Sequence, residues 1–152
     1  MNKGWFIALL TGLGVVTLAT LPPFVGETAQ GYLMQAFEMV CHQLPGRSPH
    51  VDGVQLAVCH RCYGIYLGLP LASLIYLGVK GRRLDRRVAP LVLGLSVVPM
   101  ALDWGGDAIG LFTNTAGSRI VTGLLFGVVA GLFFVWSMVD SFLKKRSPGP
   151  DS

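Results

Sequence analysis

The sequence is organised around two short motifs, Cys41-His42-Gln43 and Cys59-His60-Arg61-Cys62-Tyr63-Gly64-Ile65-Tyr66. Together they contain all three cysteines of the chain and two of its three histidines. Thiols and imidazoles gathered in this way are typical of a metal site or of a thiol–disulfide centre. The apolar runs on either side predict that these motifs are held at one face of a membrane.

The composition of the 152 residues is that of an integral membrane protein. Hydrophobic residues make up 52% and charged residues only 13%, whereas soluble domains carry about 25% charged residues. The net charge of +4 does not indicate nucleic-acid binding, because the basic residues form short clusters beside apolar runs. We expect a single domain, residues 1–152, in the lipid bilayer, with no nucleic-acid partner.

Four apolar runs predict an all-α membrane protein with four transmembrane helices, since about 20 apolar residues span the hydrocarbon core. A cleaved signal peptide is the alternative interpretation of the first run. Lys3 is the only basic residue before that run, and no small-x-small cleavage site precedes Pro22-Pro23. A retained helix is therefore favoured. The predicted spans are residues 5–21, 63–79, 88–104 and 120–142.

The segment 27–62 connects the first two spans and carries the cysteines. In residues 27–44 the apolar side chains follow the helical period. This pattern predicts a short amphipathic helix on the membrane surface that delivers Cys41 and His42 at its C-terminal end. Residues 45–53 are rich in Pro and Gly, and we expect a loop there.

The basic residues predict the orientation of the chain. Lys3, five residues in the loop 80–87 and three in 144–146 make up nine of the twelve. Four alternating spans place all nine on one side, and positively charged loops remain in the cytoplasm. We therefore expect both termini to be cytoplasmic, the segment 27–62 to be extracytoplasmic, and the protein to be a multi-pass protein of the cell inner (plasma) membrane.

The lengths of the spans predict which polar residues lie at the same depth. At 1.5 Å per residue, Cys62 lies about 27 Å from Lys80 and Asp103 about 24 Å from Arg87. The hydrocarbon core is about 30 Å thick, so both positions fall near the outer boundary. We expect the cysteines to share one site there with Asp103, Asp107 and Arg119.

The two cysteine motifs resemble the signature of a family of small prokaryotic integral membrane proteins, which is a domain of unknown function. A second polar block resembles that family in Asp103, Asp107, Asn114, Arg119 and Thr122-Gly123. The resemblance covers roughly residues 41–127. It implies a membrane-embedded site of Cys, His, Asp and Arg residues, and it brings no established activity.

Metal binding is the first hypothesis for this site, with zinc favoured and copper(I) less so. Zinc takes four ligands in a tetrahedron, and Cys-x-x-Cys supplies two of them from one turn. His60 lies between these two and we expect it to point away. The predicted ligands are Cys41, His42, Cys59 and Cys62. Asp103 and Asp107 compete with His42 for the fourth position, and a zinc that only staples the outer loop is an alternative.

Thiol–disulfide chemistry is the second hypothesis. A Cys-x-x-Cys at the outer end of a membrane helix is similar in architecture to small four-helix oxidoreductases that pass electrons from thiols to quinone. Cys59 and Cys62 would form the disulfide, and Cys41 would be the exchange partner. Such enzymes usually need a second cysteine pair, which this chain lacks. An inert disulfide with one free thiol is the simpler version.

The polar cluster supports a third hypothesis, in which a divalent ion helps to bind an anionic head group. Ionisable residues at the edge of a membrane are costly and often functional. A structural ion pair between an aspartate and Arg61 or Arg119 is the alternative. The residues concerned are Arg61, Asp103, Asp107, Asn114 and Arg119.

Glycines spaced four residues apart predict close helix packing. They are Gly64 and Gly68, Gly106 and Gly110, and Gly123, Gly127 and Gly131. Packing within one chain is favoured over a homo-oligomer or a membrane-protein partner, although a structural subunit of a larger complex remains an alternative. The sequence contains neither the nucleophile–base pair of a hydrolase nor a phosphate-binding glycine loop, so it leaves open whether the protein is an enzyme.

Overall fold

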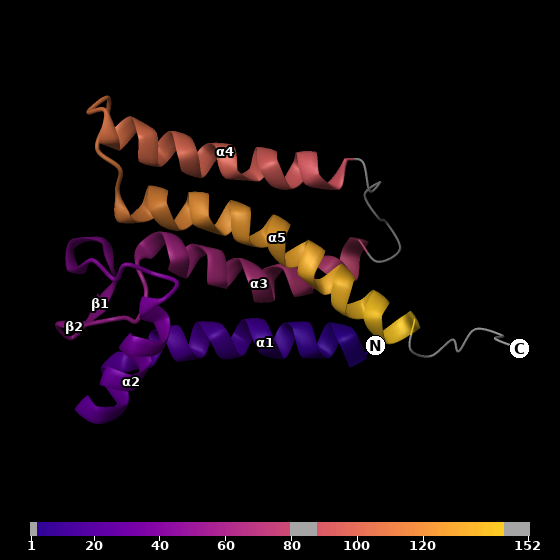
Figure 1. The fold of residues 1–152 in the computed structure, drawn as a ribbon, viewed down its shortest axis with the longest axis horizontal. Coiled ribbons are helices and arrows are strands. Elements are labelled where there is room, and N and C mark those ends of the chain that lie inside the picture. The colour runs from indigo at the N-terminus through magenta and orange to yellow at the C-terminus, as the bar shows by residue number, and fades with distance from the viewer. Residues whose placement is uncertain (1–2, 80–87, 145–152) are drawn as a thin grey trace, which may run out of the picture.

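The computed structural model describes residues 3–79 and 88–144 and confirms the predicted all-α architecture. Four of its helices are long and apolar enough to cross a membrane. They are α1 (Lys3–Thr20), α3 (His60–Val79), α4 (Ala89–Ala108) and α5 (Ala116–Lys144), which run along one another in a single bundle (Figure 1). The predicted basic loop 80–87 and the bases at 145–146 lie outside the described residues.

The centre of the bundle is the α3–α5 interface, and α1 packs against both of these helices while α4 packs against α5. A methyl group added at Gly64, Gly68 or Gly127 would overlap the backbone of the facing helix. Small residues let the two backbones approach because no side chain separates them. These glycines therefore serve packing within the chain, as favoured from the sequence.

The prediction that Gly106 and Gly110 form a further helix-packing pair is wrong. The space beside Gly106 is filled by the ring of Phe112, a residue of the connection that follows α4. Gly106 therefore contacts this connection and not a neighbouring helix. Gly110 lies beyond the end of α4 with φ +73. This backbone conformation strains L side chains, so the glycine serves the turn that leaves the helix.

The helix α1 is an integral part of the bundle. Its Trp5 is buried and donates an indole hydrogen bond of 2.7 Å to the carbonyl oxygen of Ser73 in α3. At its other end, buried Ala19 packs in one cluster with Cys41 and Val58. The first apolar run thus contributes directly to the packing around a cysteine.

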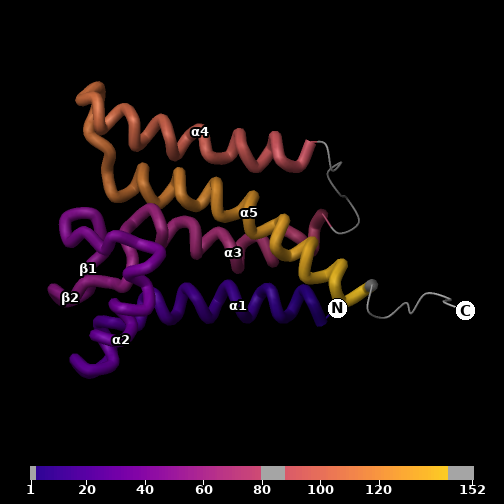
Figure 2. The backbone as a smooth tube through the Cα atoms, in the orientation of Figure 1, coloured from indigo at the N-terminus to yellow at the C-terminus, as the bar shows by residue number. Residues whose placement is uncertain are grey.

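The segment between α1 and α3 folds over one end of the bundle, as the tube in Figure 2 shows. It comprises the 3-10 turns η1 (Pro22–Phe24) and η2 (Pro45–Arg47), the helix α2 (Glu27–Glu38) and two short antiparallel strands, β1 (His50–Val51) and β2 (Val54–Gln55). We call this end the cysteine end. The ends of α1 and α5 nearest the chain termini lie at the opposite end (Figure 1).

Two details of this segment differ from the sequence predictions. The helix α2 ends at Glu38, so Cys41 and His42 follow the helix in an irregular stretch and do not form its last turn. The expected loop 45–53 contains half of a β-hairpin whose turn is Asp52-Gly53, with φ values of +50 and +80. Asp-Gly favours this tight hairpin turn because both residues tolerate positive φ.

Candidate metal centre and polar cluster

The structure brings the three cysteines together at the cysteine end. One ligand atom from each of Cys41, Cys59 and Cys62 lies within 4.8 Å of the other two. Cys41 is buried, with 4% of its surface exposed, and the other two are half-buried. No disulfide joins them. Three sulfur donors from two separate parts of the chain therefore converge on one point.

The start of α3 explains how two of the thiols are placed. Cys59 immediately precedes the helix, and its carbonyl oxygen accepts a 2.9 Å hydrogen bond from the backbone N–H of Tyr63. Cys62 lies three residues further on, in the first turn, and so on the same side of the helix. The backbone N–H of Cys59 donates to the sulfur of Cys41 over 3.2 Å, which ties the third thiol to this helix terminus.

The surroundings of Cys59 favour its thiolate form. The hydrogen bond from the Cys62 thiol, with smaller contributions from the Cys62 backbone and from Cys41, lowers the pKa of Cys59 to about 5, against the opposing effect of burial. The N-terminus of a helix also favours a negative charge. Cys59 is therefore a ready ligand or nucleophile near neutral pH.

Gln43, the third residue of the first motif, holds Cys41 in place. Its side-chain nitrogen donates to the carbonyl oxygens of Met34 in α2, over 2.7 Å, and of Ala57 before Cys59, over 2.8 Å. Its backbone has φ +47, in the left-handed region. The sequence pattern predicts no separate role for Gln43, although the residue lies directly beside Cys41-His42. The residue acts by positioning the two cysteine segments relative to each other.

The histidines lie outside the group of three sulfurs. His42 is exposed and lines the same cavity as the thiols, so the structure does not bring it to the ligand atoms. His60 is occupied by the carbonyl oxygen of Arg47, 2.7 Å from its Nδ1. His50 is exposed, and its Nδ1 lies 3.0 Å from the carbonyl oxygen of Ser48. Of the three histidines, His42 is the one that lines the cavity beside the thiols.

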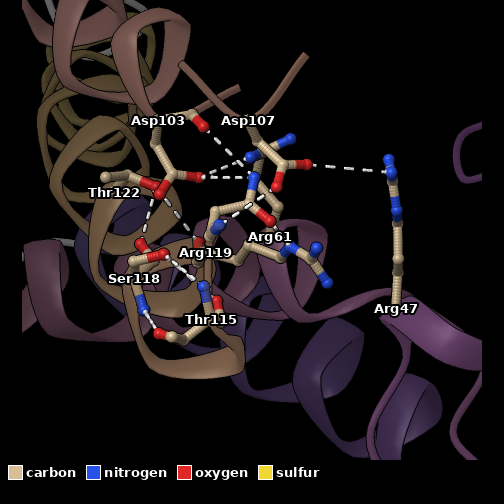
Figure 3. Close-up of polar contacts among 9 residues, drawn as sticks. Arg47, Arg61, Asp103, Asp107, Thr115, Ser118, Arg119 and Thr122 are labelled. Atoms are coloured by element: carbon tan, nitrogen blue, oxygen red, sulfur yellow. Dashed lines mark hydrogen bonds and ion pairs between the residues drawn. The ribbon is translucent and has the colours of Figure 1, made fainter. Parts of the chain in front are cut away.

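The predicted polar block also comes together, where α4 and α5 meet the start of α3 (Figure 3). The guanidinium of Arg61 donates to the carboxylate of Asp103 over 2.6 Å, and Asp103 is only 7% exposed. Asn114 binds both aspartates: its side chain donates to the Asp103 carbonyl oxygen over 3.2 Å and its backbone N–H to the Asp107 carboxylate over 3.1 Å. Arg119 Nε donates to the Asn114 side-chain oxygen over 2.7 Å.

Asn114 links α4 to α5, and the pair of Arg61 and Asp103 links α3 to α4. Asp103 and Asp107 were competing predictions for the fourth metal ligand. Neither belongs to the group of residues that could hold an ion, which consists of the three cysteines. Arg47, which the sequence did not single out, lies 3.9 Å from the Asp107 carboxylate. Arg47 is the only Lys or Arg of the loop 45–53, and this isolated base was the available signal.

A cavity of about 330 Å³ separates the two groups of residues. Its lining includes the three thiols and three arginines, Arg47, Arg61 and Arg119. The lining residues are Val40, Cys41, His42, Gln43, Leu44, Arg47, Cys59, Arg61, Cys62, Trp104 and Arg119. A ligand in this cavity would meet the sulfurs and the guanidinium groups together.

A bundle of four membrane-spanning helices with a thiol cluster and an Asp/Arg cluster at one end thus defines the class of this membrane protein. The family model described as "Predicted membrane protein (DUF2085)" matches residues 41–133. The chain belongs to this family.

A curated relative, "Uncharacterized protein MJ1492" of Methanocaldococcus jannaschii, is 30% identical over 156 residues, which cover 95% of this chain and 99% of the relative. No solved structure matches the chain. The match to the family begins at Cys41 and includes both clusters.

Proposed function

We propose that the protein binds a soft metal ion through Cys41, Cys59 and Cys62, with zinc favoured over copper(I). The observation that carries the proposal is the convergence of the three ligand atoms within 4.8 Å. Zinc at about 2.3 Å from each sulfur of a tetrahedron requires sulfurs about 3.8 Å apart. The sulfurs, which lie within 4.8 Å of one another, would have to approach by about 1 Å or less to reach this spacing.

Thiolate donors also fit the chemistry of a soft or borderline metal. The three thiols and His42 line the same cavity, so His42 is the protein side chain that we propose would supply a fourth ligand. A zinc site with three protein ligands and one exchangeable position is the arrangement found in catalytic sites, whereas a fourth protein ligand makes a structural site. Whether His42 binds therefore decides which of the two roles the metal has.

The location of the metal follows from the proposed topology. The basic residues of the chain concentrate at Lys3 and in the segments 80–87 and 144–146. Lys3 and the end of α5 lie at the end of the bundle opposite the cysteines (Figure 1). The positive-inside rule supports a cytoplasmic location for that end and an extracytoplasmic location for the cysteine end. The plasma membrane is the proposed membrane.

Thiol–disulfide exchange is the second candidate, and the lowered pKa of Cys59 supports it. Oxidation of Cys59 and Cys62 to a disulfide releases two electrons and two protons, which a quinone takes up in becoming a quinol. Cys41 would then be the exchange partner. A third candidate, a structural subunit of a larger membrane complex, predicts that the isolated protein is unstable and copurifies with that complex.

The experiment that tests the proposal measures metal content and free thiols on protein purified in mild detergent without chelator. We expect about one zinc per chain, with thiols that react only after chelation. His42→Ala tests the fourth ligand, and His50→Ala is the matched control because this histidine is exposed and outside the group. Protein without metal and with one reactive thiol of three would instead support the disulfide and the redox candidate.

A further inference from the structure

The cavity beside the thiols has a cationic wall. Its lining includes the side chains of Arg47, Arg61 and Arg119, and no aspartate or glutamate. These are the three Lys or Arg residues of the chain other than Lys3 and those of the segments 80–87 and 144–146. Bases placed against the positive-inside pattern need another reason for their position.

The three arginines differ in how far their charge is already neutralised. Arg61 is paired with buried Asp103 over 2.6 Å. Arg47 makes only a 3.9 Å contact with Asp107, and its side chain is 49% exposed. Arg119 binds neutral Asn114 through Nε, and within residues 3–79 and 88–144 it forms no ion pair. Figure 3 shows its guanidinium apart from the Asp103 carboxylate. Arg119 and Arg47 therefore lack a close ion pair like that of Arg61, although the charge of Arg119 also acts on Asp103.

The rim of the same cavity is apolar. Val40, Leu44 and Trp104 line the cavity and remain 61%, 50% and 57% exposed. Large apolar side chains beside a membrane-spanning helix contact lipid without cost, because the lipid chains are as apolar as they are. Trp also favours the level of the lipid head groups. The apolar chain of a ligand that extends from the cavity along these three side chains would enter the bilayer.

We propose that the cavity binds the phosphate-type anionic head group of a membrane amphiphile, with Arg119 and Arg47 on the oxyanion and the apolar chain along Val40, Leu44 and Trp104. Guanidinium groups bind such oxyanions through paired, charge-assisted hydrogen bonds. A cavity of about 330 Å³ is at the lower end of the size of small-ligand sites. This inference goes beyond the proposed function. It rests on that function at one point only, which is that a metal bound by the thiolates would form the opposite wall of the cavity.

The test is a binding titration of the detergent-purified, full-length protein with dihexanoyl phosphatidic acid below its micelle concentration. Dihexanoyl phosphatidylcholine and inorganic phosphate are the comparison probes. We expect the phosphatidic acid to bind most tightly. Arg119→Gln should weaken this binding about tenfold, since a charged hydrogen bond is lost, and Arg119→Lys should weaken it less. Lys3→Gln is the matched control, because it removes one exposed positive charge at the opposite end.

Equal binding of phosphatidic acid by Arg119→Gln and by the original protein would overturn the proposal, and so would equal binding of phosphatidylcholine. Equally tight binding of inorganic phosphate would overturn the part played by the apolar rim. Metal content is measured on every variant, since Arg119 is not a proposed metal ligand. Head-group binding by a metal-free protein would contradict the proposed function alone, whereas zinc without head-group binding would contradict this inference alone.

Discussion

The thiol cluster and the polar cluster lie at the same end of the bundle and line one cavity, but their bonding differs. In the polar cluster the side chains bind one another: Arg61 binds Asp103, and Asn114 joins both aspartates to Arg119. In the thiol cluster the three sulfurs converge without a disulfide. The comparison indicates that the contacts of Arg61, Asp103 and Asn114 hold helices α3, α4 and α5 together, while the thiols retain the capacity to bind a metal ion.

Removing one thiol gives the sharpest form of this comparison. Cys59→Ser replaces a soft thiolate with a poor zinc ligand, and we expect metal binding to fall more than about 100-fold. Elemental analysis of the purified variant measures the effect. Asp103→Asn should keep its zinc, because this carboxylate is held by Arg61 and not by the sulfurs. Retained zinc in Cys59→Ser would break the distinction between the clusters.

Removing a charge from the polar cluster should show the opposite pattern. Asp103→Asn leaves the guanidinium of Arg61 largely buried without its anion, and loss of one partner of such a pair destabilises a fold by about 3 kcal/mol. Thermal or denaturant unfolding in detergent measures the change. Asp107→Asn is the matched control, because Asp107 is 22% exposed and its ion pair spans 3.9 Å. Equal losses in both variants would show that the Arg61 pair has no special weight.

The acidity of Cys59 makes a prediction about pH. Its pKa is lowered to about 5, so the thiolate predominates above pH 5 and is lost as the pH falls through that value. In reduced, metal-free protein, we expect the rate of iodoacetamide alkylation at Cys59 to fall about tenfold between pH 6 and pH 4. Mass spectrometry of the modified peptides measures this rate. An ordinary thiol, with a pKa near 8.5, would instead already lose reactivity between pH 9 and pH 7.

The smallest effect should come from Arg47. This side chain is 49% exposed and its ion pair spans 3.9 Å, and exposed pairs of this kind contribute about 0.5 kcal/mol or less. Arg47→Gln should therefore leave the free energy of unfolding and the zinc content almost unchanged. A large loss of stability would show that Arg47 belongs to the structural network and that the boundary of the polar cluster is wider than described.

The four long helices could be predicted from the sequence because each of them coincides with a long apolar run. The predicted span 63–79 compares with α3 at His60–Val79, and the predicted span 88–104 with α4 at Ala89–Ala108. The extra turns are those that carry Cys62 and Asp107. A hydropathy pattern ends where polar residues begin, so it stops short of helix ends that are polar for a functional or structural reason.

The lengths of the spans and the distribution of charge predicted that the two clusters lie at the same end of the bundle. They did not predict the individual contacts within each cluster. Which nitrogen of Arg61 meets Asp103, and that Asn114 joins both aspartates, depends on helix rotation, which the sequence pattern leaves undetermined. The proposed His42 ligand illustrates the same limit, since its exposed position depends on where α2 ends. The β-hairpin was missed although Asp52-Gly53 is a strong hairpin signal, because the surrounding Pro and Gly suggested only a loop.

The most direct test of the central claim is X-ray absorption spectroscopy at the zinc edge of the purified protein. We expect three sulfur scatterers at about 2.3 Å and one nitrogen or oxygen scatterer at about 2.0 Å from the metal. Loss of the light scatterer's imidazole signature in His42→Ala would identify the fourth ligand. Zinc surrounded by nitrogen and oxygen alone, or protein that holds no metal, would contradict the account.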